Sequence, residues 1–210
     1  KMIDMRRYKV LMEGDMAPEL QTTFANMETN FNPYGFGFGS RGDWLPADLG
    51  VKLLSEDAEV DYVYFVGCAA SYDKRSQKVA IALLSVMKKA GLKVGILGAE
   101  EACCGDAAMR GGNEYLFHSL ATQNLETFKA YGVKKIITTC PHGYNMLKKE
   151  YESFSKVGMG SDGNPLEYNI EVYHHTEVLD ELIKSGKIKL KEALNETITY
   201  HDSCFLGRYN

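Results

Sequence analysis

The stretch Tyr62–Cys68, YVYFVGC, decides how the chain folds. Its first five residues are all apolar and rich in aromatic and β-branched side chains, which is typical of a strand buried on both faces of a sheet. Gly67 and Cys68 follow this run directly. We therefore expect Tyr62–Val66 to form a buried strand, with Cys68 at its carboxyl end.

The same order of elements recurs downstream. Apolar residues recur at helical spacing between Lys74 and Ala90, and Gly91 ends the pattern. The further elements expected are strand 93–97, helix 113–131, strand 135–139, helix 144–151, strand 170–173 and a helix through residues 178–183 that ends before Gly186. Strands that alternate with helices of this length favour a parallel sheet. The predicted fold class is α/β, a parallel sheet with flanking helices.

The first 56 residues differ from the rest. Asp15–Met27 is compatible with a helix that has Pro18 in its first turn, whereas the segment NPYGFGFGSRGDWLP after it is dense in glycine and proline. We expect residues 1–56 to be a helical and extended linker that packs on a neighbour. Residues 57–196 are then the main domain.

The last residues, TITYHDSCFLGRYN, repeat the scheme of a short β run followed by a cysteine, here Cys204. The helix that should follow this cysteine is missing. We therefore expect residues 197–210 to be the start of a second, truncated copy of the domain, and the chain to be a piece of a longer protein.

Composition narrows the function. The 210 residues are 45% hydrophobic and 25% charged, as is ordinary for a folded soluble protein, and the net charge of −4 gives no electrostatic footprint for nucleic acid. No run of about 18 apolar residues could span a membrane, and the charged N-terminus lacks the apolar stretch of a signal peptide. Cytoplasmic residence is the expectation. Five cysteines in that compartment favour metal binding or redox chemistry over disulfides.

Four of the cysteines are regularly spaced. Cys68 is separated by 34 residues from the pair Cys103-Cys104, and Cys140 follows that pair after 35 more. Each stands at or soon after the carboxyl end of an expected strand, so a parallel sheet would bring all four to one edge. Converging soft thiolates are what an iron–sulfur cluster needs. Small residues that leave room for a bulky cofactor stand in the same loops: Ala69, Ala70, Gly105, Ala107 and Ala108.

Other interpretations of the cysteines stay open at this point. Cys68 taken alone could be a small buried apolar residue. Tetrahedral zinc also uses four cysteines, but its usual Cys-x-x-Cys knuckles are absent here. A thiol–disulfide switch is a further alternative, although a disulfide between the adjacent Cys103 and Cys104 would be strained.

The spacing resembles that of the CCG domain, the cysteine-rich domain of heterodisulfide reductases and of related iron–sulfur oxidoreductases. That family combines a lone cysteine, a Cys-Cys-Gly, and a Cys-x-x-Cys at intervals like those found here. The likeness covers residues 60–204. The segments KMIDMRRYKVLMEG, NPYG…RGDW and GCAASYD are similar to the subset in which a ferredoxin-type domain precedes the CCG domains. Members of that subset often stand beside electron-transferring flavoprotein or a membrane quinone reductase.

The resemblance implies a role for every cysteine. Cys68, Cys103, Cys104 and Cys140 are by this likeness the ligands of a four-iron cluster, cubane or noncubane. Cys204 is by the same likeness the first ligand of a second cluster in the full-length protein.

The chain departs from the family pattern at Gly143, where a further cysteine is expected. The four remaining thiolates could hold a cubane cluster, a noncubane cluster with an outer ligand, or an open iron. His142 beside the gap could replace the missing ligand, although a loop histidine bonded to its surroundings is the commoner case.

Two other pairs of residues could serve a site. His174 and His175 end the fourth expected strand, where they could line the pocket or cap the next helix, and we favour the cap. His201 and Asp202 precede the last cysteine and could assist a second cluster.

The expected function is an iron–sulfur electron-transfer module of a larger, heterodisulfide reductase-like oxidoreductase. Electrons would pass between a ferredoxin-type domain and a second CCG site that is linked to a quinone or a disulfide, and the flavoprotein-like segments favour the quinone. Electron-transferring flavoprotein and a membrane quinone-reactive protein are the implied partners, and they would bring the protein to the inner face of the membrane. The alternative is a non-catalytic docking scaffold whose site, with Gly143, holds no cluster.

Overall fold

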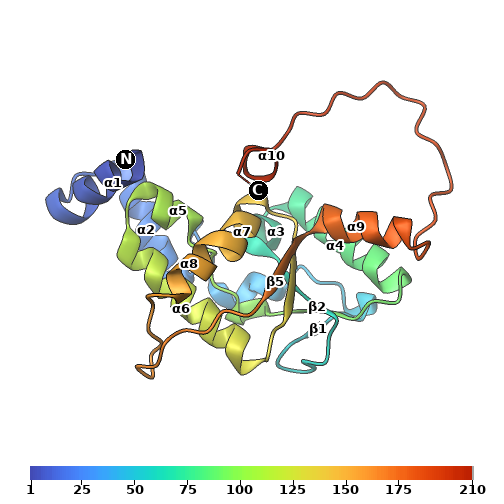
Figure 1. Cartoon of the computed structure of the whole chain (residues 1–210), viewed down its shortest axis with the longest axis horizontal. Helices are drawn as coiled ribbons and strands as arrows, with labels where there is room; N and C mark the ends of the chain where they lie inside the picture. The colour runs from blue at the N-terminus through green and yellow to red at the C-terminus, as the bar shows by residue number, and fades with distance from the viewer. Residues whose placement is uncertain (210) are drawn as a thin grey trace.

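The computed structural model describes residues 1–209, which fold around one five-stranded sheet (Figure 1). The strands are β1 (Lys52–Leu53), β2 (Tyr62–Phe65), β3 (Val94–Ile96), β4 (Lys135–Thr138) and β5 (Glu171–His174). They pair in the order β1-β3-β2-β4-β5, and every pair is parallel. The predicted α/β fold with a parallel sheet is therefore confirmed.

Helices cover both faces of the sheet and make it the middle of three layers. Side chains of β2 alternate between the faces, since Phe65 packs in one apolar cluster with Phe128 while Tyr64 packs in the other with Leu84. One face is covered by α2 (Pro18–Asn30), α6 (Glu114–Ala130) and α8 (Tyr151–Ser155), and the other by α4 (Lys74–Lys89) and α9 (His175–Lys184). Burial on both faces explains why the strands are continuous apolar runs.

Short helices begin where the central strands end. They are α3 (Gly67–Tyr72) after β2, α5 (Asp106–Gly111) after the loop that follows β3, and α7 (Pro141–Asn145) after β4. α7 continues through a π-helical segment, Met146–Glu150, into α8. The helix expected over residues 144–151 therefore begins earlier, because Pro141 is suited to the first helical position.

The N-terminal residues form more of the domain than the linker expected over residues 1–56. They fold as α1 (Met2–Tyr8), a π-helical segment Lys9–Glu13, α2, and two 3₁₀ turns, Phe38–Gly42 and Ala47–Leu49. Phe24 and Met27 of α2 are buried in the core, and β1 is an edge strand paired with β3. The sheet thus begins at Lys52, before the domain boundary expected at residue 57.

The C-terminal residues differ from the expectation. Residues 189–203 contain neither helix nor strand, so the β run expected at TITY is absent from the structure. This segment arcs away from the body of the molecule, where no strand lies beside it, and an unpaired strand is not stable (Figure 1). The short helix α10 (Cys204–Gly207) returns to pack against α7.

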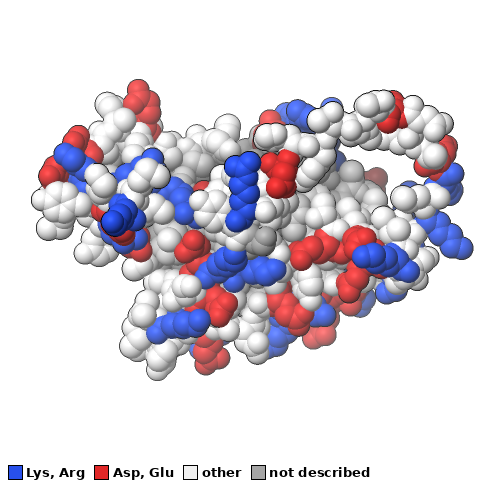
Figure 2. All heavy atoms as spheres, turned by 45° about the horizontal axis from the view of Figure 1, so that its top comes forward, with Lys and Arg blue, Asp and Glu red and all other residues white. Residues whose placement is uncertain are grey.

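Acidic and basic side chains are interspersed on the face shown in Figure 2, without a broad field of either sign. Within the described part of the chain, every helix is too short or too polar to cross a bilayer.

Candidate metal centre

The site lies where the chain order of the sheet reverses. β2 is central, with β3 on one side and β4 on the other, and parallel sheets bind ligands outside the strand ends at such a point. Phe65 at the end of β2 pairs with Thr138 at the end of β4. The loops beyond them lie close together, since a Cβ added at Gly67 would be 3.9 Å from Cβ of Cys140.

Cys68 and Cys140 are placed by the way these two strands end. Gly67 has a φ of +76°, a left-handed conformation that suits glycine and turns the chain out of β2 into α3, so that Cys68 lies in the first turn. Cys140 is the N-cap of α7, and its Sγ accepts a hydrogen bond from the backbone N–H of Gly143 at 3.4 Å. Both thiols are partly buried.

The pair Cys103-Cys104 is fixed by Asn124 of α6, a side chain with no exposed surface. Oδ1 of Asn124 accepts from the N–H of Ala102 at 3.0 Å, and its Nδ2 donates to the carbonyl oxygens of Ala102 and Cys103 at 3.2 and 3.3 Å. Gly105 after the pair has a φ of +83° and is the N-cap of α5. A buried amide thus holds the backbone that presents the two thiols.

The thiols of different loops meet. Those of Cys68 and Cys103 are close enough to share a hydrogen bond, as are those of Cys103 and Cys104, while the charge of Cys68 acts on Cys140 and raises its pKa after burial does. Burial and then the charges of Cys68, Cys103 and Cys140 raise the pKa of the Tyr34 phenol, an effect that requires the phenol to be near these three sulfurs. The structure therefore brings together all four cysteines that the spacing singled out.

The environment raises the pKa values of Cys68, Cys103 and Cys140, so these three thiols stay protonated unless a metal displaces the protons. The hydrogen bond to Cys103 and then burial raise the pKa of Cys68, against the lowering effect of Arg41. Burial raises the pKa of Cys140. All five cysteines are free thiols, and a metal would bind the thiolate form with release of protons.

A buried ion pair braces the site. The side chains of Arg41 and Glu101 are each 1% exposed, and Nη2 of Arg41 lies 2.7 Å from Oε1 of Glu101. The same carboxylate accepts hydrogen bonds from the backbone N–H groups of Val66 and Gly67, both at 2.8 Å. Glu101 thus ties the loop before the cysteine pair to the turn that carries Cys68. Neither Arg41 nor Glu101 was expected at the site, because no pattern in the sequence marks them as buried.

His142 and His174 have structural partners. Nδ1 of His142 lies 2.8 Å from Oδ2 of Asp106, and its ring packs 4.5 Å from the ring of Phe205. His174 caps α9, as favoured from the sequence: its N–H donates to Glu177, and its Nε2 lies 3.3 Å from the carbonyl oxygen of Thr139.

The ring of His175 packs against that of His174, with 4.3 Å between the ring centroids. Nδ1 of His175 is buried and has no hydrogen-bond partner among the described residues, and burial lowers its pKa to about 4. His201, Asp202 and Cys204 are exposed, so their role at a second site stays a prediction.

Among residues 1–209, no three cysteine, histidine, aspartate or glutamate side chains surround one ion position. Tetrahedral zinc needs four ligands at about 2.0–2.3 Å from one centre, so the zinc alternative gains no support from the geometry. A cluster of several irons has its ligand sulfurs further apart, because each thiolate binds a different iron.

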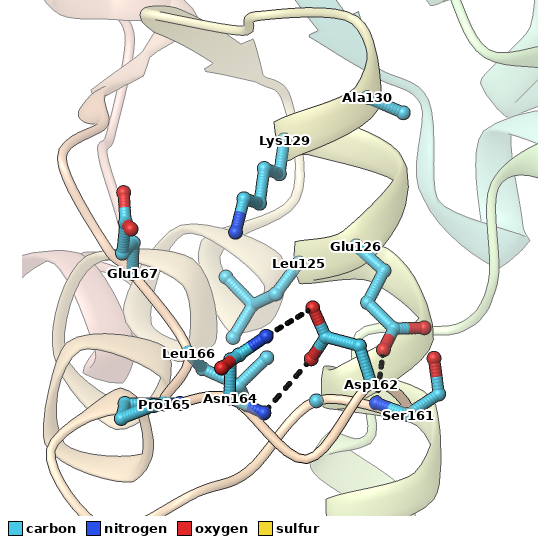
Figure 3. A pocket seen from close by; sticks show the side chains of 11 residues that line it. Leu125, Glu126, Lys129, Ala130, Ser161, Asp162, Asn164, Pro165, Leu166 and Glu167 are labelled. Atoms are coloured by element: carbon cyan, nitrogen blue, oxygen red, sulfur yellow. Dashed lines mark hydrogen bonds between the residues drawn. The ribbon is translucent and has the colours of Figure 1, made fainter.

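A separate cavity of about 400 Å³ lies between the end of α6 and residues 160–167 (Figure 3). Two of its three acidic side chains already have partners: Glu126 accepts from the N–H of Ser161, and Asp162 accepts from the N–H and the side-chain amide of Asn164. No cysteine lines this cavity, so it is not part of the site.

The fold and the four thiols define a cysteine-rich α/β domain with a thiol cluster at the switch point of its sheet. Residues 62–148 match the family model of the cysteine-rich domain CCG, from the first residue of β2 into the helix after Cys140.

Three relatives are similar over most or all of this chain. The EtfAB:quinone oxidoreductase of Syntrophomonas wolfei is 49% identical and the probable iron–sulfur-binding oxidoreductase FadF of Bacillus subtilis 44%, each over 100% of this chain and over 28% and 29% of its own length. One polypeptide of the dihydromethanophenazine:CoB–CoM heterodisulfide reductase of Methanosarcina mazei is 38% identical over 85% of this chain and 40% of its own length. The chain thus spans less than half of these relatives. No solved structure matches it.

Proposed function

We propose that Cys68, Cys103, Cys104 and Cys140 hold an iron–sulfur cluster, and that this domain transfers electrons as part of a larger iron–sulfur oxidoreductase. The observation that carries the proposal is the convergence of four free thiols from the ends of three neighbouring strands. The donor set fits, since soft thiolates are the ligands that iron–sulfur clusters use. Relatives named as iron–sulfur and quinone oxidoreductases support the same class.

The residues of this chain hold and shield the cluster, which supplies one-electron chemistry when bound. Asn124 and the Arg41–Glu101 pair fix the backbone and one sulfur of the site. Tyr34 lies near the sulfurs on the side of the Gly-rich loop. Burial and hydrogen bonds to sulfur are the protein's means of setting a cluster potential.

Four thiolates match the four irons of a cubane cluster one to one. A noncubane cluster would need a further ligand near Gly143, and His142 is held by Asp106 instead. We therefore propose a four-iron cubane cluster in this domain. A second cluster that begins at Cys204 belongs to the same proposal for the whole protein.

The proposed route takes electrons from a ferredoxin-type domain or from electron-transferring flavoprotein toward a quinone. The support is the name of the Syntrophomonas wolfei relative, an EtfAB:quinone oxidoreductase, at 49% identity. Disulfide reduction is the second chemistry, favoured by the heterodisulfide reductase relative at 38% identity. On either route a membrane partner would hold the protein at the inner face of the membrane.

Iron content tests the proposal. Anaerobically purified protein is expected to absorb broadly near 400 nm and to contain about four irons per chain, with an electron paramagnetic resonance signal after reduction. Cys103→Ser should lose the cluster while the circular dichroism of the fold remains. In this 210-residue chain Cys204→Ser is the matched control, because its exposed thiol lies outside the site of the other four cysteines, and the irons bound there should remain. Folded wild-type protein with well under one iron per chain would instead identify a docking scaffold.

A further inference from the structure

Arg41 is the largest side chain buried completely in this domain, and it lies at the site although it comes from outside the family match. Burial alone would lower its pKa, but the charge of Glu101 and of the Cys68 sulfur raises it, so the guanidinium stays charged. A buried charge is costly unless it is paired and hydrogen-bonded, so the contacts of Arg41 must compensate the cost of burying it.

The guanidinium contacts both the loop that carries Cys68 and the surroundings of Cys103. Its Nη2 donates to Sγ of Cys68 at 3.5 Å, and its Nε and Nη2 bind Glu101 at 3.2 and 2.7 Å. Its Nη1 donates to the carbonyl oxygen of Phe31 at 3.3 Å, and that oxygen also accepts the N–H of Cys103 at 2.9 Å. Arg41 thus donates a hydrogen bond to the sulfur of Cys68, and it shares the carbonyl oxygen of Phe31 as an acceptor with the backbone N–H of Cys103.

We propose that Arg41 is a positioning residue that sets the reduction potential of the cluster, with Glu101 as its opposing charge. This inference rests on the proposed function of the four cysteines. Reduction adds one electron to the cluster, and a fixed positive charge with an N–H aimed at a ligand sulfur stabilises the more negative state. Arg41 is protonated before and after the step, so no proton moves. The buried carboxylate acts in the opposite direction.

The two residues have opposite charges, so the shifts in midpoint potential that their variants cause can separate this role from a merely structural one. Removal of the cation in Arg41→Met should lower the midpoint potential, while removal of the anion in Glu101→Gln should raise it. If the two residues only hold the loops in place, both substitutions should disturb the cluster in the same direction. Arg41→Lys keeps the charge but loses the planar fork, and it should lower the potential less than Arg41→Met.

The experiment is a dithionite titration of the anaerobic holoprotein, followed by electron paramagnetic resonance, with iron content and circular dichroism measured on each variant. For Arg41→Met we expect a fall on the order of tenfold in the reduced-to-oxidised ratio at fixed potential, which is about 59 mV for a one-electron couple. Arg75→Met is the matched control, because Arg75 is exposed, and its potential should equal that of the wild type.

The outcomes keep the two proposals apart. Wild-type protein without iron would overturn the proposed function. Iron-loaded variants whose potentials all equal the wild-type value, or all shift in one direction, would overturn the role of Arg41 and leave the cluster in place. If Arg41→Met does not fold, the opposite shifts of Arg41→Lys and Glu101→Gln decide the question.

Discussion

Replacement of Gly105 by alanine tests why a glycine follows the cysteine pair. Gly105 has a φ of +83°, and a Cβ built on it would lie 2.8 Å from Cδ2 and 3.6 Å from Cα of Phe117. Two separate costs follow. An L-residue in this left-handed conformation costs about 1–2 kcal/mol, and a forced overlap in a packed core costs about 1–3 kcal/mol.

These costs are partly offset, because alanine lowers the entropy of the unfolded chain by about 0.4–1 kcal/mol. We expect Gly105→Ala to reduce the free energy of unfolding by about 3 kcal/mol, the middle of these combined ranges. Gly132 provides the matched control, since its φ is +62° and nothing lies within 4 Å of an added Cβ. Gly132→Ala should therefore cost only about 1 kcal/mol, the conformational part alone.

Urea unfolding of the reduced protein, followed by circular dichroism, measures both values, and iron content after anaerobic purification measures the effect on the site. Because Gly105 is joined to Cys104, the overlap should also displace the pair and lower the iron per chain in Gly105→Ala alone. Equal losses of stability in the two variants, with equal iron, would refute the role assigned to the contact with Phe117.

Three further predictions concern the surroundings of the site. A Cβ at Gly143 would lie 3.6 Å from Cβ and 4.0 Å from Sγ of Cys140, which is ordinary contact, so Gly143→Cys should change the free energy of unfolding by less than about 1 kcal/mol. The added thiol should alter the electron paramagnetic resonance spectrum of the cluster, and an unaltered spectrum would contradict this prediction. Asn124→Ala should cost about 3 kcal/mol in urea unfolding, because buried groups of Ala102 and Cys103 lose their partner, whereas the exposed Asn195→Ala should change stability by less than about 0.5 kcal/mol. The pKa of His175 falls from 6.5 to about 4, so the unfolded chain takes up a proton first and stability is lost as pH falls from about 6.5 to about 4. Solvent screening of the partly exposed ring limits this loss to about 1–2 kcal/mol, and an equal loss in His175→Gln would disprove the assignment.

The sequence predicted the parts of this molecule that depend on local patterns. The apolar run before Gly67 and the recurrence of strand and helix led to the parallel sheet, and parallel strand ends placed the cysteines on one edge. The two-residue strand β1 could not be predicted, because it is too short to show alternation and depends on the free edge of β3. The opposite error occurred at TITY, where the residue types favour a strand but no neighbouring strand is present.

The charged pair could not be predicted for a different reason. Arg41 lies in a Gly-rich stretch that resembles a surface loop, and Glu101 is one of two adjacent acids. Their burial depends on each other, since either charge alone would be too costly to bury. Such mutual dependence over 60 positions leaves no periodic signal in the chain.

The origin of Arg41 upstream of the family match affects how the domain can be handled. The stretch that defines the family by its cysteines begins at residue 62, yet the cation that neutralises its buried carboxylate comes from residue 41. If residues 62–148 were excised or grafted alone, Glu101 would remain buried without a counterion. The smallest segment that can be transferred as a folded domain is therefore longer than the stretch that matches the family model.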